Sequence, residues 1–262
     1  TIKNPLSPDL SALSTTLACN LLRVVSWNKN RMEKNLRIFE LGKVFFVTQE
    51  KLPEERLNLG IAISGARTPR HWEAKEVEAD LYDLKGMVEG LFEHLSLSFK
   101  LIPGNQALFE PNGCFHIQTE NEKIGHLGEL SKEILEVFEV KDRVFWAEFD
   151  LEKVFSRVPT QKEFSALLKF PPVDRDMAVV VDEKLLSREI VDKIKEIGGS
   201  TVEEVSLFDV YRGKQLPPGK KSLAYSIRYR SLEKTLTDEE VEEIHRKVIS
   251  ELGKCFDATL RK

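Results

Sequence analysis

The chain has 262 residues, of which 41% are hydrophobic and 31% are charged, and its formal net charge is −4. This balance is typical of a globular protein and excludes a uniformly basic nucleic-acid binder, so any contact with nucleic acid must be local. Since most domains contain roughly 100 to 150 residues, the length favours two domains.

The cysteines and the hydropathy pattern indicate a reducing, cytoplasmic environment. Cys19, Cys114 and Cys255 lie far apart, are odd in number and form no C-x-x-C pair, so neither a disulfide framework nor a zinc ribbon is predicted. No apolar run approaches the roughly 20 residues of a membrane span, and no signal peptide opens the chain. The chain begins at Thr1 without a methionine, which suggests a fragment of a longer protein.

The first half of the chain predicts an α+β unit. Ser7, Pro8 and Asp9 are typical of a helix start, and a following apolar stripe predicts a helix from Pro8 to Asn30. The stripe consists of Leu10, Leu13, Leu17, Leu21 and Val24. The segments "LRIFELGKVFFV" and "LNLGIAISG" then predict two strands, and "DLYDLKGMVEGLFEHLS" predicts a second amphipathic helix. Four shorter strands follow, near Leu108 and over 115–118, 123–130 and 145–150, so a mainly antiparallel sheet is expected.

The second half predicts a ferredoxin-like domain. After a segment without periodicity (151–169), the pattern gives a strand over 176–182 and a helix with Ser187 as a possible cap. Two strands follow, then a helix with the capping box Thr237–Glu240, and a short edge strand "ATLR". This β-α-β-β-α-β order is that of the split βαβ unit. We therefore predict domains at 1–160 and 161–262.

The stretch "YRGKQLPPGKKSLAYSIRYR" is not a nucleotide-binding loop. Five residues separate Gly213 from Gly219 where a phosphate loop has four, and Lys221 stands where Ser or Thr is required. Two prolines also remove backbone N–H donors from the loop. The residues after it alternate between apolar and polar, which predicts a strand rather than the helix that such a loop must open.

No metal or catalytic motif is evident. The five histidines are scattered, and Cys114 with His116 gives two ligands on one strand face without a third, so no metal site is predicted. The GxxG within "IGHLGEL" can clamp a nucleic-acid backbone in another context, but its apolar neighbours favour a twisted strand.

Positive charge gathers in the second domain. Between Arg212 and Lys234 there are seven basic residues and a single acid, Glu233. Alternation places Tyr225 and Ile227 toward the helices, and leaves a polar, basic face with Ser222, Ser226, Arg228 and Arg230. A sheet with such an open face is a known platform for single-stranded RNA, with Phe208 as a candidate for base stacking. An ordinary solvated lysine loop would give the same pattern, so both interpretations stay open here.

Five sequence blocks resemble a known family. "FPPVDRDMAVVVDE", "LFDVYRGKQLPPGKKSLAYSIRYR" and "EKTLTDEEVEEIHRKVISEL" are similar to the ferredoxin-fold anticodon-binding domain that ends bacterial phenylalanyl-tRNA synthetase β subunits. "NPLSPDLSALSTTLACNLL" and "LRIFELGKVF" resemble the preceding module, a non-catalytic relative of the class II synthetase fold. The resemblance implies a chain that scaffolds the α subunit and binds tRNA(Phe) within an (αβ)2 heterotetramer. It implies no contact with a membrane.

The charge pattern and the resemblance together give candidate residues for these roles. The predicted tRNA contacts are Arg175, Phe208, Arg212, Lys214, Lys220, Lys221, Arg228 and Arg230. The apolar stripe from Leu10 to Val24 is expected to face the α subunit, although burial within its own domain would give the same sequence pattern.

No catalytic residue is expected in this chain. A class II active site needs an arginine and an acid just after the "LRIFELGKVF" strand, where this sequence has Phe46, Val47, Thr48 and Gln49. Without such cations, the developing phosphate charge of adenylate formation lacks electrostatic support. ATP and Mg²⁺ are then used by the holoenzyme and not held by this chain. The alternative function is a structural fragment whose second domain packs on protein and binds no RNA.

Overall fold

A computed structural model describes residues 4, 11–49, 52–68, 71–73, 75–161 and 169–261. The chain divides into two compact units, Thr1–Glu163 and Phe164–Lys262, close to the boundary expected from the sequence. Within the described residues, no helix combines the length and hydropathy needed to cross a membrane.

The first unit is built on a six-stranded antiparallel sheet in the order β1-β2-β8-β7-β6-β5. Its strands are β1 (Leu36–Phe46), β2 (Glu54–Ser64), β5 (Lys100–Gly104), β6 (Phe109–Thr119), β7 (Glu122–Leu130) and β8 (Val144–Asp150). A small hairpin of β3 (Ala66–Thr68) and β4 (Val77–Glu78), which the sequence pattern did not predict, stands apart from this sheet.

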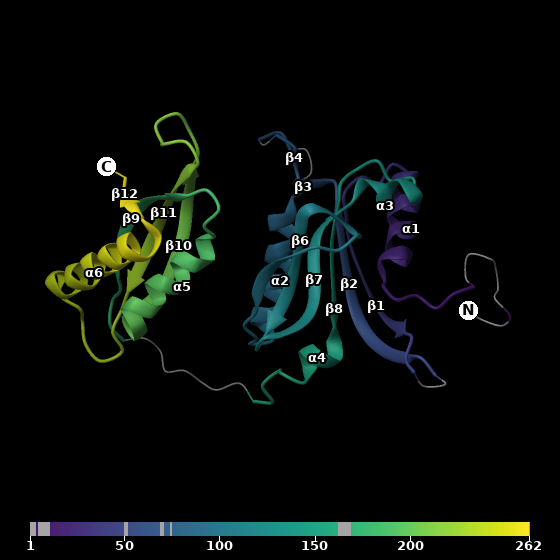
Figure 1. Ribbon diagram of the computed structural model, residues 1–262, viewed down its shortest axis with the longest axis horizontal. Helices are drawn as coiled ribbons and strands as arrows, with labels where there is room; N and C mark the ends of the chain where they lie inside the picture. Colours follow the sequence, from purple (N-terminus) through teal and green to yellow (C-terminus); the bar gives the residue numbers. More distant parts are fainter. Residues whose placement is uncertain are drawn as a thin grey trace. The chain divides into compact units, whose positions relative to one another are not determined.

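Helices cover both faces of this sheet (Figure 1). Helix α1 (Ala18–Lys29) and the short α3 (Lys132–Val137) pack on one face, and α2 (Leu81–His94) packs on the other. Strand β8 lies between them, and every residue from Val144 to Phe149 is buried. The predicted antiparallel α+β unit is therefore confirmed, and its core consists of two layers of apolar side chains around a central strand.

The first helix is shorter than predicted. It begins at Ala18 rather than Pro8, and residues 11–17 are described as non-helical; the proposed start at Ser7–Asp9 and Leu10 lie outside the described residues. The reason is a buried carboxylate on β8. Glu148 accepts hydrogen bonds from the Thr16 hydroxyl at 2.5 Å, from the Leu17 backbone N–H at 3.2 Å and from the Asn58 amide at 2.8 Å. The Thr16 hydroxyl and the Leu17 N–H are therefore bonded to Glu148, and the helix begins only at the next residue, Ala18.

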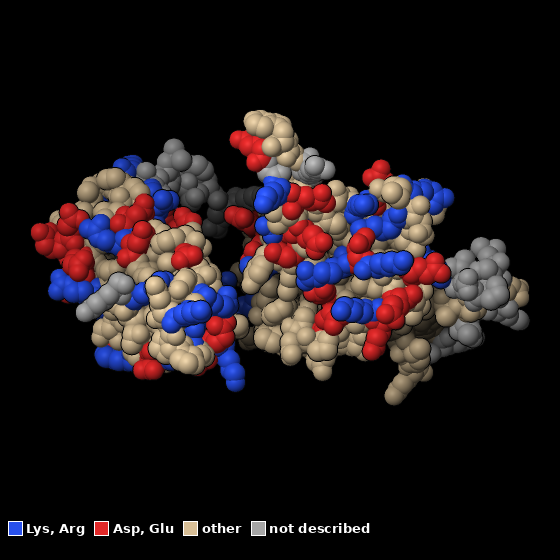
Figure 2. All heavy atoms as spheres, turned by 90° about the horizontal axis from the view of Figure 1, so that it is seen from above, with Lys and Arg blue, Asp and Glu red and all other residues tan. Residues whose placement is uncertain are grey.

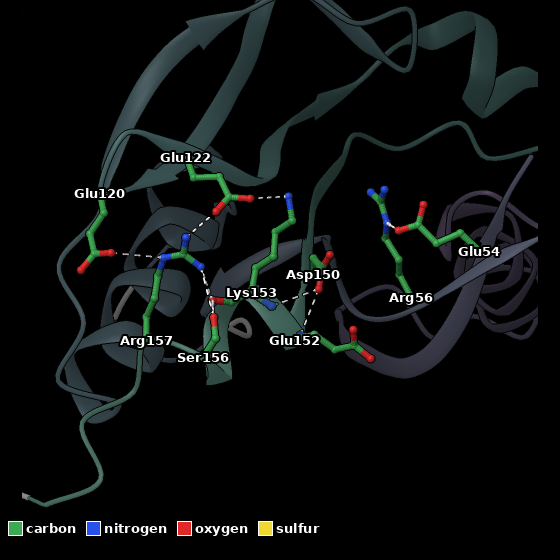
Figure 3. A network of polar contacts seen from close by, with 9 residues as sticks. All are labelled: Glu54, Arg56, Glu120, Glu122, Asp150, Glu152, Lys153, Ser156 and Arg157. Carbon is green, nitrogen blue, oxygen red and sulfur yellow. Dashed lines mark hydrogen bonds and ion pairs between the residues drawn. The ribbon is translucent and has the colours of Figure 1, made fainter. Parts of the chain in front are cut away.

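Charged side chains hold the last helix of the first unit, α4 (Leu151–Phe155), against the β6–β7 turn (Figure 3). The Asp150 side chain caps α4 by accepting from the backbone N–H groups of Glu152 and Lys153. Lys153 and Arg157 both form ion pairs with Glu122. Because each of these cations already faces a carboxylate, the network is structural.

The second unit has the predicted ferredoxin-like topology. Its four-stranded antiparallel sheet has the order β10-β11-β9-β12, and its two helices pack on one face (Figure 1). The elements are β9 (Val173–Asp182), α5 (Ser187–Gly198), β10 (Val202–Tyr211), β11 (Lys220–Tyr229), α6 (Asp238–Phe256) and β12 (Thr259–Leu260). The short "ATLR" strand is thus confirmed at the sheet edge next to β9.

The ends of the two helices in this unit differ in how well the sequence predicted them. Thr237 and Glu240 form the expected reciprocal capping box at the start of α6. Ser187 does not cap α5, because its hydroxyl lies 2.9 Å from the Tyr225 hydroxyl instead. A buried phenol needs a hydrogen-bond partner, and here the Ser187 hydroxyl pairs with Tyr225 instead of capping the helix.

Gly60 tests the packing of the first unit. A Cβ at this position would lie 2.6 Å from the Trp146 ring and 3.2 Å from Leu17, both of which are buried. We expect Gly60→Ala to lower the free energy of unfolding by about 1–3 kcal/mol through overpacking. Gly86→Ala, at an exposed position of α2 where a Cβ meets nothing within 4 Å, is the control and should raise the free energy of unfolding by about 0.5–1 kcal/mol. Urea denaturation of both variants checks the opposite signs.

His126 gives the first unit a dependence on pH. Its Nε2 is buried without a hydrogen-bond partner among the described residues, its ring meets Phe109 edge-on, and burial lowers its pKa to about 4. The unfolded chain therefore binds the proton more readily than the folded unit, so stability present above pH 6.5 is lost as the pH falls toward 4.

Between pH 7 and pH 5 we expect His126 to account for a loss of about 1–2 kcal/mol of unfolding free energy. His126→Phe should flatten this dependence, whereas His71→Phe, at an exposed position, should not. Urea denaturation at the two pH values measures the difference, and an unchanged pH dependence in His126→Phe would show that another group titrates.

Candidate nucleic-acid interface

The helix-free face of the second unit's sheet is the surface that the sequence pattern assigned to RNA. The predicted alternation along β11 is confirmed, because Leu223, Tyr225, Ile227 and Tyr229 are all buried with the helices. Arg228 lies on the opposite face, between Asp174 of β9 and Glu204 of β10 in the strand register. The platform therefore exists as a surface, and its chemistry depends on which side chains occupy it.

Lys221 does not lie on this surface. It shares the helix-facing side of β11 with Leu223, is only 7% exposed, and its Nζ donates to the Glu183 carbonyl oxygen at 2.8 Å. This placement contradicts the prediction of an exposed phosphate contact. The two consecutive lysines could not both face the same side, because neighbouring residues of a strand point to opposite faces.

Most of the other predicted cations are already paired with carboxylates of the same unit. The ion pairs are Arg175–Asp238 (2.6 Å), Arg212–Glu183 (2.8 Å), Lys220–Asp257 (3.6 Å), Arg228–Asp174 (2.9 Å) and Arg230–Glu203 (2.9 Å). The Arg228 guanidinium lowers the pKa of Asp174 through this hydrogen bond. In the described part of the chain, Lys214 is the predicted contact without such a partner.

The surface is therefore mixed in charge rather than uniformly basic. Figure 2 shows Lys and Arg interspersed with Asp and Glu over the second unit on the face in view. The local excess of cations between Arg212 and Lys234 is offset by acids from other segments of the unit, among them Asp174, Glu183, Glu203 and Asp257. Exposed ion pairs of this kind contribute little stability, so a phosphate group can compete for the cation.

An aromatic residue that the sequence analysis did not select lies on the open face. Tyr211, at the end of β10, is opposite Ser222, and the Arg261 guanidinium stacks 4.2 Å from the centre of its ring. Ser222 and Ala224 form a buried floor of small side chains beside this pair. A tyrosine ring next to an arginine plane is the arrangement on which nucleic-acid bases stack.

Two local features explain why Tyr211 was missed. A bulge between Leu207 and Asp209 shifts the alternation of β10, so the face on which Tyr211 lies cannot be read from a period of two. Gly213 also lets the loop pass close to the ring, since a Cβ there would come within 2.5 Å of it. Phe208, the predicted stacking residue, lies at the bulge and is 60% exposed.

The predicted subunit-contact stripe separates into two groups. Leu17 and Leu21 are buried in the core of the first unit, so their apolar character is explained by their own domain. Leu13 and Val24 are each 44% exposed and are available to a partner. Leu10 lies outside the described residues.

Residues 47–49, the described residues directly after β1, include no cation at the place where a class II active site has one. Val47 follows the strand and is 98% exposed. The nearby Arg56 on β2 forms an ion pair with Glu54 at 2.6 Å (Figure 3). Its guanidinium also lies 4.5 Å from the centre of the Phe46 ring. Among the described residues, no three His, Cys, Asp or Glu side chains gather as a metal site.

Two protein-family models match the chain. Residues 1–151 match the family model of the phenylalanyl tRNA synthetase beta chain CLM domain, and residues 169–261 match that of the ferredoxin-fold anticodon binding domain. Two solved pyrrolysyl-tRNA synthetase structures from Desulfitobacterium hafniense resemble part of the chain. The first covers 58% of this chain and 51% of its own, with a TM-score of 0.44 and 18% identity. The second covers 54% and 48%, with a TM-score of 0.42 and 18% identity.

Similar curated proteins carry one name. The phenylalanine–tRNA ligase beta subunits of Clostridium tetani and Symbiobacterium thermophilum are both 38% identical to the chain over 99% of its length. The chain spans 32% of the first and 29% of the second. It thus belongs to the phenylalanyl-tRNA synthetase β-chain family, as a CLM domain followed by a ferredoxin-fold anticodon-binding domain.

Proposed function

We propose that this chain is part of a cytoplasmic phenylalanine–tRNA ligase and binds the anticodon stem-loop of tRNA(Phe). It also acts as a scaffold for the catalytic α subunit in an (αβ)2 assembly. The observation that supports the proposed RNA binding is the Tyr211–Arg261 stack on the open face of a four-stranded sheet. Stacking supplies affinity without a strongly positive surface, which fits the paired cations around it.

Phosphate contacts play a smaller part than the sequence alone indicates. Lys214 is free to meet the RNA backbone, whereas Arg228 has to exchange Asp174 for a phosphate. The gain from that exchange is small, because one charge-assisted contact replaces another. The affinity for tRNA should therefore depend more on Tyr211 than on any single cation.

The first unit acts as a scaffold rather than as an enzyme. Residues 47–49 after β1 provide no arginine–acid pair, and Arg56 is engaged by Glu54 and Phe46, so these described residues offer no free cation for the α-phosphate of ATP. ATP and Mg²⁺ then bind to the α subunit. Leu13 and Val24 are the members of the predicted contact stripe that a partner can reach.

Tyr211 and Lys214 separate the stacking contribution from the electrostatic one. We expect Tyr211→Ala to weaken binding of tRNA(Phe) by about 1–3 kcal/mol at constant salt slope, because one stacked base is lost. Lys214→Ala should instead reduce the slope of log K against log salt by about 1. Filter binding at several salt concentrations measures both, and Tyr82→Ala in the first unit, at an exposed tyrosine, is the control.

Two outcomes of that titration would count against the RNA assignment. Failure of the unsubstituted chain to bind tRNA even at low salt would favour the alternative, in which the second domain packs on protein. Equal loss of affinity in the Tyr211 and Tyr82 variants would show that the RNA lies elsewhere.

Pyrophosphate exchange tests which subunit catalyses adenylate formation. The chain by itself should give no phenylalanine-dependent ATP–pyrophosphate exchange, because it lacks the cations that stabilise adenylate formation. Exchange should be measured for the α subunit alone and for the α subunit co-expressed with this chain. We expect activity only in the second sample; exchange by the isolated chain would contradict the scaffold role.

A further inference from the structure

Glu183, directly after β9, holds both ends of the loop between β10 and β11. Its carboxylate accepts a hydrogen bond from the Arg212 Nε at 2.8 Å, at the start of the loop. Its backbone N–H donates to the Gly219 carbonyl oxygen at 2.9 Å, and its own carbonyl oxygen accepts from the Lys221 Nζ at 2.8 Å. These three contacts form the Glu183 clamp, in which every polar group of one residue binds the same loop or the strand that follows it.

Two tight turns shape the loop between these attachment points. The Leu216 N–H donates to the Gly213 carbonyl oxygen at 3.0 Å, and the Lys220 N–H donates to the Pro217 carbonyl oxygen at 3.2 Å. Gly219 has a φ of 77°, which glycine adopts without strain and which a type II turn requires at its third residue. The loop therefore has a defined shape, and its two ends determine where that shape is placed.

Lys221 occupies an apolar row of the sheet. It precedes Leu223, Tyr225 and Ile227 on the helix-facing side of β11, where these three residues belong to the core. The lysine is only 7% exposed, and within the described residues its partner is a carbonyl oxygen rather than a carboxylate. Burying a lysine is costly, because its charge loses hydration. An apolar residue would suit this position better for stability, so the bond to Glu183 indicates a role other than core packing.

The clamped loop carries one group of the proposed RNA surface and supports another. Lys214, an exposed cation, lies in the first turn of the loop. Gly213 passes so close to Tyr211 that a Cβ there would come within 2.5 Å of the ring. The position of the loop therefore determines where the Lys214 cation lies and how the Tyr211 ring is held.

We propose that Lys221 and Glu183 are positioning residues for RNA binding. The Lys221 cation contacts no phosphate; it binds the Glu183 carbonyl oxygen and so fixes the loop where Lys214 and Tyr211 meet the RNA. A loop that is held in place before binding loses less conformational entropy in the complex. The Glu183 carboxylate acts in the opposite direction, because it pairs with Arg212 and competes with phosphate for that cation. The inference rests on the proposed function, which assigns the open face of this sheet to RNA.

Substitution of Lys221 distinguishes positioning from phosphate contact. Lys221→Met retains the length of the side chain and removes the bond to the Glu183 carbonyl oxygen. We expect this variant to bind tRNA(Phe) about three- to tenfold more weakly, because the loop is no longer preorganised, at an unchanged slope of log K against log salt. Lys247→Met, at an exposed position of α6 on the helix-covered side of the sheet, removes the same charge and should change neither quantity. Filter binding at several salt concentrations measures both.

Glu183→Gln tests the carboxylate separately from the backbone. The amide side chain leaves the two backbone bonds of residue 183 in place and removes the charge that pairs with Arg212. We expect tRNA(Phe) to bind about two- to fivefold more tightly, because an exposed ion pair no longer competes with phosphate. The two variants of the clamp thus have opposite effects on affinity. Weaker binding by Glu183→Gln would overturn the competing role of the carboxylate.

Hydrogen exchange tests the clamp in the unsubstituted chain. The Glu183 amide donates to Gly219 and reports on opening of the loop end. Because the loop is already in place, addition of tRNA(Phe) should change its exchange rate by less than about threefold. In Lys221→Met the same amide should exchange about tenfold faster without RNA. The Tyr225 amide, in the middle of β11, is the internal standard.

The outcomes separate this inference from the proposed function. If the unsubstituted chain binds no tRNA, the RNA assignment fails, while exchange in the free chain still tests the clamp. If RNA binds and Lys221→Met lowers the salt slope by about 1, Lys221 contacts phosphate and the inference is overturned. Equal affinity of Lys221→Met and Lys247→Met would overturn it as well. Should Lys221→Met fail to fold, slowing of the Glu183 amide by about tenfold on addition of tRNA would show a loop that is not preorganised and would overturn the inference.

Discussion

The buried carboxylate of Glu148 determines how the N-terminal segment meets the six-stranded sheet. A charge with 2% exposure in the central strand requires donors, and it finds them in Thr16, the Leu17 backbone and Asn58. These bonds fix Leu17 over Gly60 and Trp146, and α1 can begin only at the next residue. Loss of any donor would leave part of a buried charge unsatisfied, which costs more than an ordinary hydrogen bond.

The hydrogen bonds to Glu148 also determine which part of the edge strand β1 is covered. With Thr16 held at Glu148, Ser14 reaches the end of β1 and pairs with Phe45, while the outward backbone from Phe39 to Lys43 pairs with no other described residue. The apolar surface available to a partner is thus found on β1 and β2 as well as at the exposed positions Leu13 and Val24 of the N-terminal segment. One buried charge therefore links the packing of the first unit to the surface that it presents.

In the second unit, most cations that the sequence pattern assigned to RNA are paired with acids, and an aromatic residue that it did not select lies on the open face. Arginines that look free along the chain meet acids on neighbouring strands, as Arg228 meets Asp174 and Glu204. Tyr211, in contrast, pairs with Arg261, which is 50 residues away in sequence. A sheet surface that is nearly balanced in charge can still hold RNA through base stacking, with selectivity set by shape rather than by net charge.

The sequence by itself determined the order and type of most elements, because hydrophobic periodicity and capping boxes such as Thr237–Glu240 are local properties. It also identified the family through blocks in a fixed order. Tertiary structure decided the start of α1, the burial of Lys221 and the face of the sheet on which Tyr211 lies. Each of these depends on groups far apart in the chain: a buried carboxylate on β8, a carbonyl at Glu183, and a bulge set against β11. Periodicity contains no information about such partners, since hydrogen bonds and ion pairs between distant strands form only when the sheet brings them together.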